Sequence, residues 1–237
     1  LKSISFDKWI PMECYGHIIY YFHCNDLNKI SIELENLKIA LETEPNATLE
    51  IAMNVLYATY YKRLGLLDKA IEHHTRSMEL WKNINDEINY ACSAGNIAWI
   101  YMEQKNYLKA IKYWLIPCRM IPNENFCFNL AWCYYVTNQK NLALEVIKDS
   151  KDAVEVDQYH FALIKWLKYH IKEEYGQKAK KQLKTIYDDY FSTMTKDMQK
   201  FLLIALIKQA KHDNNHEDYY QYTDILIKTN INSLITM

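Results

Sequence analysis

An asparagine and a tryptophan stand three residues apart twice in this chain, as Asn96 and Trp99 and then, 33 residues later, as Asn129 and Trp132. Residues three apart share one face of an α-helix, so each pair would present an amide beside an aromatic ring. An amide carries a donor and an acceptor and can bond the backbone of an extended ligand. The ring adds an apolar wall with an N–H at its edge. The two pairs together suggest a peptide groove.

The same residue types also have structural roles. Tryptophan in helical proteins often packs in the core between neighbouring helices, and asparagine can cap a nearby backbone group. The spacing alone does not decide between ligand contacts and structural contacts, so both interpretations stay open here.

The two pairs belong to a longer repeat that is set by small residues. Ala70, Ala110 and Ala143 align with one another, with a tyrosine nine residues before each (Tyr61, Tyr101, Tyr134) and an alanine twelve before each (Ala58, Ala98, Ala131). Small residues are needed where two helices cross closely, and an aromatic ring fills the wedge beside the crossing. Short polar turns such as EQKNY and TNQKN would reverse the chain. The pattern predicts helical hairpins.

This pattern resembles the tetratricopeptide repeat, a helix pair of about 34 residues. The first clear repeat begins at Ile51 and carries extra residues in SMELWKNINDEINY, the second covers residues 91–123, and the third covers 124–156. Pro122 falls where that repeat has its closing proline. Weaker copies place Phe22 nine residues before Ser31 and His170 nine before Ala179.

We therefore expect an all-α protein, a right-handed superhelix of about six tetratricopeptide-like helical hairpins. The prediction is a single solenoid over residues 1–237, clearest at 51–156, with degenerate terminal hairpins at 12–42 and 196–229.

The resemblance implies which residues line the concave channel. Asn96 and Asn129 hold the sixth position of the first helix, and Trp99 and Trp132 hold the ninth. The same register adds further candidates for peptide binding: Tyr20, Arg63, Asn125, Phe128, Lys165 and Lys168. A channel that is aromatic in the middle and basic toward its carboxyl end suits a short apolar peptide with a carboxylate. A lysine row is equally typical of a solvated face.

Composition excludes several classes of function. The formal net charge of -1 gives no basic field, so we expect no direct nucleic-acid binding by this segment. No apolar run approaches the roughly 20 residues that cross a bilayer, so we expect no membrane span. With four isolated glycines, there is no glycine-rich phosphate loop. The chain begins at Leu1, and we expect it to be a fragment.

We also expect no enzyme activity, no cofactor and no metal. The cysteines form no C-x-x-C pair and read as reduced core residues of a cytoplasmic protein. His212 and His216 are four apart, but HDNNHED reads as a polar turn rather than a metal site. No cysteine and histidine pair can be argued into a catalytic dyad from spacing alone.

The repeat style, the paired asparagines and the Lys-, Ile-, Asn- and Tyr-rich composition resemble the peptide-sensing domain of the RRNPP quorum-sensing regulators of Gram-positive bacteria and their phages (Rap, PlcR, NprR, Rgg and AimR). That resemblance implies a receptor for a short pheromone-like oligopeptide, a homodimer, and an amino-terminal effector domain absent from this chain. In that family inner asparagines hold the peptide backbone, and Asn96 and Asn129 match that role.

The rival hypothesis is a tetratricopeptide scaffold that docks the tail of a partner protein. The carboxylate clamp of such scaffolds has a lysine at a fifth position and an asparagine at a ninth. Here Gly95 and Phe128 hold the fifth and the two tryptophans hold the ninth, so the clamp is missing in its usual form.

Overall fold

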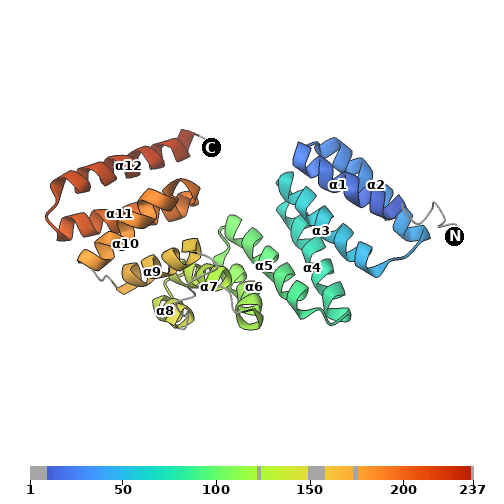
Figure 1. Ribbon diagram of the computed structural model, residues 1–237, viewed down its shortest axis with the longest axis horizontal. Coiled ribbons are helices and arrows are strands. Elements are labelled where there is room, and N and C mark those ends of the chain that lie inside the picture. Colours follow the sequence, from blue (N-terminus) through green and yellow to red (C-terminus); the bar gives the residue numbers. More distant parts are fainter. Residues whose placement is uncertain (1–9, 122–123, 149–157, 173–175, 236–237) are drawn as a thin grey trace. The chain divides into compact units, whose positions relative to one another are not determined.

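The described part of the chain is built from paired helices. The computed structural model describes residues 10–121, 124–148, 158–172 and 176–235. The pairs are α1 (Ile10–Cys24) with α2 (Leu27–Thr43), α3 (Ala47–Arg63) with α4 (Leu67–Asn83), α5 (Glu87–Glu103) with α6 (Tyr107–Met120), α7 (Glu124–Val136) with α8 (Lys140–Lys148), α9 (Gln158–Lys172) with α10 (Gln177–Tyr190), and α11 (Lys196–His212) with α12 (His216–Ile235). A short 3-10 helix, η2 (Phe191–Thr193), follows α10. The predicted all-α class is confirmed (Figure 1).

Two compact units divide the chain, one over residues 1–122 and one over residues 123–237. Unit 1 contains α1 to α6 and unit 2 contains α7 to α12. Each is described by itself. A single continuous solenoid over residues 1–237 stays a prediction, and Pro122, expected to close the second clear repeat, lies outside the described residues.

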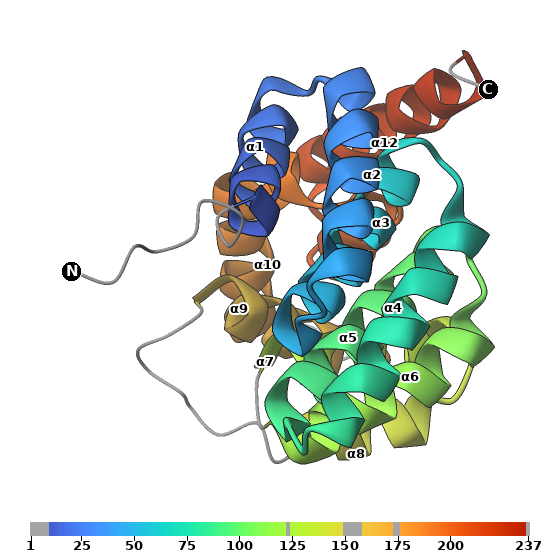
Figure 2. The same ribbon diagram turned by 90° about the vertical axis from the view of Figure 1, so that its right-hand side faces the viewer.

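Close helix crossings occur at the alanines that define the repeat. Ala58, Ala70, Ala98 and Ala110 in unit 1, and Ala131 and Ala143 in unit 2, are all 0% exposed. A methyl group at the crossing lets two helix axes approach to about 8–10 Å. In Figure 2, α4, α5 and α6 lie side by side in unit 1, where consecutive helices contact each other.

A left-handed residue reverses the chain at six turns. These residues are Asn25, Gly65, Asn85, Lys105, Asn138 and Asn214, with φ between 53° and 73°. The backbone N–H of the residue that follows each donates to a carbonyl five positions back, at 2.8–3.0 Å. This bond caps the end of the preceding helix as in a Schellman motif. Glycine and asparagine tolerate positive φ better than other residues, which explains five of the six choices.

These bonds correct the register of the first hairpin. In the three clear repeats the acceptor carbonyls belong to Tyr61, Tyr101 and Tyr134, as the aligned tyrosines require. In the first hairpin the acceptor is Tyr21. Nine residues later stands Ile30, which is 0% exposed, whereas Ser31 is exposed. The predicted pairing of Phe22 with Ser31 is therefore wrong by one residue, because Phe22 also offered an aromatic ring at a plausible spacing.

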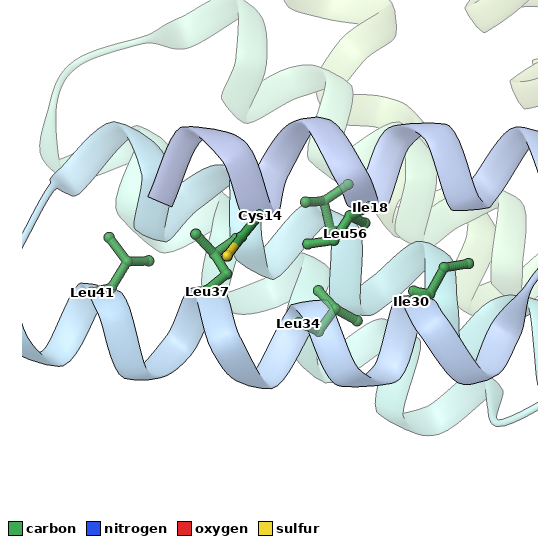
Figure 3. Close-up of a cluster of buried hydrophobic side chains, with 7 residues drawn as sticks. All are labelled: Cys14, Ile18, Ile30, Leu34, Leu37, Leu41 and Leu56. Atoms are coloured by element: carbon green, nitrogen blue, oxygen red, sulfur yellow. The ribbon is translucent and has the colours of Figure 1, made fainter. Parts of the chain in front are cut away.

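Unit 1 has a hydrophobic core where α1 packs on α2 and α3 (Figure 3). Its members are Cys14, Ile18, Ile30, Leu34, Leu37, Leu41 and Leu56. The four from α2 recur at helical spacing along one face. Burying each large aliphatic side chain stabilises the fold by about 1.5–3 kcal/mol. None of the helices within the described ranges has the length and apolar character needed to span a membrane.

His74 is a buried polar residue in the middle of α4. Its side chain is 5% exposed, and Nδ1 has no hydrogen-bond partner among the described residues. Burial lowers the pKa of the imidazole to about 4, with smaller contributions from Lys62 and His73. The folded chain therefore keeps His74 neutral at pH values where an unfolded histidine is protonated.

Acidification should destabilise unit 1 through His74. Between pH 6.5 and 4 the unfolded chain binds a proton that the folded chain excludes, so stability is fully present above pH 6.5 and is lost as pH falls. The loss from this group is on the order of 3 kcal/mol. Urea unfolding at pH 7 and pH 5 should show a smaller pH dependence in His74→Leu than in the parent. An equal dependence in both proteins would contradict this assignment.

Lys105 occupies a left-handed turn position, with φ of 57°, that suits glycine better. We expect Lys105→Gly to raise the free energy of unfolding by about 0.5–1 kcal/mol, because it relieves the side-chain clash at positive φ. The matched control is Lys112→Gly, at an exposed site inside α6, which should lower it by about 1 kcal/mol. Chemical denaturation of both variants measures the two values. Changes of the same sign would show that turn geometry does not decide the outcome.

Candidate functional site

One face of α5 presents the first asparagine and tryptophan pair. Cys92, Asn96, Trp99 and Glu103 recur at helical spacing along this face. Cys92, Asn96 and Glu103 are exposed and Trp99 is half-buried. The Asn96 amide makes no hydrogen bond to any described residue. A donor and an acceptor are thus open to solvent beside an indole ring.

Helix α3 contributes the neighbouring part of this surface. Lys62 Nζ lies 2.8 Å from Glu103 Oε1, an ion pair that joins α3 to α5. Both side chains are 37% exposed, so water weakens the pair. The surface is called the α3–α5 face below, and its members are Thr59, Lys62, Cys92, Asn96, Trp99 and Glu103.

Arg63 and Tyr20 lie where the first hairpin meets α3. Arg63 donates from one guanidinium nitrogen to the Phe22 carbonyl at 2.8 Å and to Asn25 Oδ1 at 3.1 Å, and it stacks over the Phe22 ring at 4.9 Å. These contacts fasten the end of α1 to α3. Tyr20 is 62% exposed. The corrected register puts Ile19, not Tyr20, at the ninth position of this hairpin, so the reason for choosing Tyr20 no longer holds.

The second asparagine is placed differently from the first. Asn129 is 2% exposed, and its Nδ2 donates to Asn125 Oδ1 at 2.5 Å. The two residues are one turn apart on α7. Asn96 and Asn129 thus share a repeat position but not an environment, and they belong to different units.

Rings from three helices of unit 2 surround Trp132. Trp132 on α7 is 2% exposed, and its ring centroid lies 5.8 Å from Trp166 on α9 and 5.1 Å from Phe201 on α11. Phe128, 6.3 Å from Trp132, is 0% exposed. We expected Trp132 and Phe128 to be walls of an open channel. They are instead core residues, because large rings from α7, α9 and α11 pack against one another.

The sequence reasoning missed several members of this aromatic cluster. Tyr135 Oη and His170 Nε2 lie 2.6 Å apart and join α7 to α9. Trp166 is 0% exposed, and its Nε1 has no hydrogen-bond partner among the described residues. An available signal was the spacing of Trp166 and His170, four residues apart on one helix face. This spacing was not recognised because the repeat pattern uses His170 but not Trp166.

The basic row of α9 is partly solvated. Lys168 and Lys172 are exposed and Lys165 is half-buried. All three lie on one face of α9, at spacings of three and four residues. A solvated lysine row can attract a carboxylate, but at the surface each contact contributes little.

Histidines and cysteines form no cluster that could hold a metal ion in the part of the chain that the structure covers. His212 Nδ1 lies 3.2 Å from Asp213 Oδ1, and no group of three His, Cys, Asp or Glu side chains could hold a metal there. None of the six cysteines is paired in a disulfide. Cys14 and Cys133 are buried as expected, but Cys24 and Cys92 are exposed, which corrects the expectation of core positions. Burial raises the pKa of the Cys133 thiol to about 12.

Known proteins share the repeat and the fold. Residues 49–113 match the family model of the tetratricopeptide repeat. No curated protein matches the chain significantly by sequence. Among solved structures, aspartyl phosphate phosphatase F from Bacillus subtilis is 14% identical with a TM-score of 0.66, covering 93% of this chain and 59% of that one. The apo form of RapI is 18% identical with a TM-score of 0.69, covering 96% of this chain and 65% of that one.

The chain thus spans about three-fifths of the length of these two proteins. At such identities the likeness shows the fold alone. The predicted fold of tetratricopeptide-like hairpins is confirmed, and the predicted resemblance to the Rap proteins is confirmed at the level of fold.

Truncation to alanine should lower the free energy of unfolding by different amounts at the two tryptophans. Trp132→Ala empties a buried site and should lower the free energy of unfolding by about 3–5 kcal/mol. Trp99→Ala removes a half-buried ring and should cost only about 1–2 kcal/mol. Urea unfolding followed by circular dichroism measures both. Equal costs would mean that Trp99 is also a core residue and is not available to a ligand.

Proposed function

We propose that this chain is the peptide-binding part of a regulatory receptor and that a short oligopeptide binds on the α3–α5 face. The observation that carries the proposal is the Asn96 amide, which is exposed and makes no hydrogen bond to any described residue. Asparagine is a poor residue for a helix interior. An asparagine whose amide bonds no other residue therefore disfavours the helix without adding a stabilising contact.

A peptide backbone matches the chemistry of this position. Each peptide group has one donor and one acceptor, and a side-chain amide can bond both. Trp99, one turn away, gives a flat apolar wall for a ligand side chain. Lys62 or Glu103 can leave their exposed ion pair and bind a charged group of the ligand at little cost in free energy.

The binding residues predicted in unit 2 are considered separately from the α3–α5 face of unit 1. Phe128, Trp132 and Asn129 are buried there, so their contact with a ligand stays a prediction. A ligand could bond Asn129 only by competing with the hydrogen bond that Asn129 donates to Asn125. Lys165 and Lys168 would act as charge partners for such a ligand.

The regulatory output is proposed from the fold shared with larger proteins. Binding would change dimerisation or the position of an attached effector domain, in a cytoplasmic quorum-sensing or phage-communication regulator. DNA contact would come only through that effector domain, since this segment has a formal charge of -1. We propose binding rather than catalysis for this chain, and the phosphatase named among the solved structures is a longer protein.

Calorimetric titration tests the proposal. The probes are synthetic peptides of about five to ten residues, taken from the end of any small secreted-peptide reading frame beside the gene. Asn96→Ala should weaken binding about tenfold, or about 1.4 kcal/mol. Asn141→Ala, an exposed asparagine on α8, is the matched control and should bind as the parent does. Because Asn129 is buried, the stability of Asn129→Ala is measured first, and its peptide affinity is then compared with that of the parent.

Alkylation of Cys92 supplies an independent readout. Cys92 is exposed one turn from Asn96, so a bound peptide should slow its modification while leaving exposed Cys24 unchanged. Binding that is unaffected by Asn96→Ala and gives no protection of Cys92 would reject this site. In that event a scaffold that docks a partner's tail becomes the better hypothesis.

A further inference from the structure

A second hollow surface lies in unit 1, away from the α3–α5 face. A cavity of about 630 Å³ opens between α2, α3 and α4. We call it the tyrosine groove, and its lining includes Ile32, Glu35, Tyr57, Tyr60, Tyr61 and His73. Successive helix residues are about 100° apart, so Tyr57 lies about 140–160° around α3 from Thr59 and Lys62. The two surfaces are therefore separate.

The groove has a flat aromatic lining. The rings of Tyr57 and Tyr61 are 6.0 Å apart and nearly parallel, with 18° between their planes. His73 stacks against both, at 4.9 Å and 5.4 Å, and Nδ1 of His73 is 3.0 Å from Asn54 Oδ1. Tyr60 stands at 56° to Tyr61. These contacts hold the rings in place before any ligand arrives, which lowers the entropy lost on binding.

Three tyrosine hydroxyls of this lining can donate hydrogen bonds to a ligand. The hydroxyls of Tyr57, Tyr60 and Tyr61 make no hydrogen bond to any described residue. Burial, with a smaller contribution from Glu35, raises the pKa of Tyr57 to about 12, so its hydroxyl stays protonated at neutral pH. A ligand that offers free carbonyl oxygens would fit such donors.

The groove continues along α3. A second cavity, of about 540 Å³, shares Lys38 and Met53 with it and reaches Asn46 at the start of the helix. From Asn46 to Tyr61 the helix rises about 22 Å, the length of about seven residues in the polyproline II conformation.

The charge of the combined lining is negative. Glu35, Glu42 and Glu50 face one lysine, Lys38. Glu35 pairs with Lys38 at 3.7 Å, and Glu50 pairs with Arg76 at 3.5 Å. Glu42 is exposed and forms no ion pair with a described residue. A basic side chain of a ligand would be attracted to the end of the groove that Glu42 lines.

We propose that the tyrosine groove docks an extended, proline-rich segment of a partner protein that carries a basic residue. Proline rings pack on flat aromatic surfaces, proline has no N–H that needs an acceptor, and the polyproline II backbone leaves every carbonyl free for the tyrosine hydroxyls. The basic residue pairs with Glu42.

Fluorescence anisotropy of the whole chain with labelled peptides tests this assignment. The probe is PPLPPLR, and its control is AALAALR. We expect the probe to bind with a Kd of about 10–100 µM and the control to bind at least about tenfold more weakly. Replacing Tyr57 and Tyr61 together by Phe keeps both rings and should weaken the probe about fivefold. Tyr113→Phe, a tyrosine that stacks on Tyr101 elsewhere in unit 1, should change nothing.

Charge and location give two more readouts. Glu42→Lys should weaken PPLPPLR a few-fold, and changing the peptide's arginine to glutamate should restore the loss. Asn96→Ala should leave this binding unchanged, which separates it from the proposed function. The proposal is wrong if both peptides bind equally, or if the tyrosine variant binds as the parent does. It is also wrong if the groove variants instead abolish self-association measured by sedimentation, because the occupant is then a second copy.

Discussion

The close crossing of paired helices is the constraint on which the rest of the structure depends. A single helical hairpin cannot enclose its apolar stripe, so each pair must approach closely and then stack on the next. The fully buried alanines, among them Ala58 with Ala70 and Ala98 with Ala110, make that approach possible. Larger side chains at these positions would separate the helices and misplace every residue that their outer faces carry.

Chain reversal is the second requirement, and it explains how much of the fold the sequence predicts. The alanine and tyrosine spacing identified the hairpins because helix crossing and turn capping occur a fixed number of residues apart. The aligned alanines lie at the crossings, and the aligned tyrosines supply the carbonyls that close the turns. Asn85, Asn138 and Asn214 hold left-handed positions and are a second turn signal, which the alanine and tyrosine spacing does not use. The predicted register of the first hairpin is wrong by one residue because Tyr21 and Phe22 are adjacent aromatic residues. Only the turn hydrogen bond identifies Tyr21 as the residue that aligns with the other tyrosines.

The candidate site was less predictable for a physical reason. Repeat position tells which side of a helix a residue lies on, but burial depends on the side chains that neighbouring helices bring to it. Asn96 stays exposed in unit 1, whereas Asn129 and Trp132 are buried in unit 2, where Trp166 and Phe201 bring large rings to Trp132. Those rings come from hairpins far along the chain, whose packing a local pattern cannot specify.

Helix α3 combines several duties in one short segment. Its exposed residues are confined to the two ends, Ala47 and Thr48 at one and Arg63 at the other. The residues between them are at least half-buried, and many belong to the core, to the α3–α5 face or to the tyrosine groove. Few substitutions there are neutral, so sequence drift between homologues should be slow in α3 and faster on the outer faces of α2 and α4. Adaptation of one surface is therefore constrained by the other.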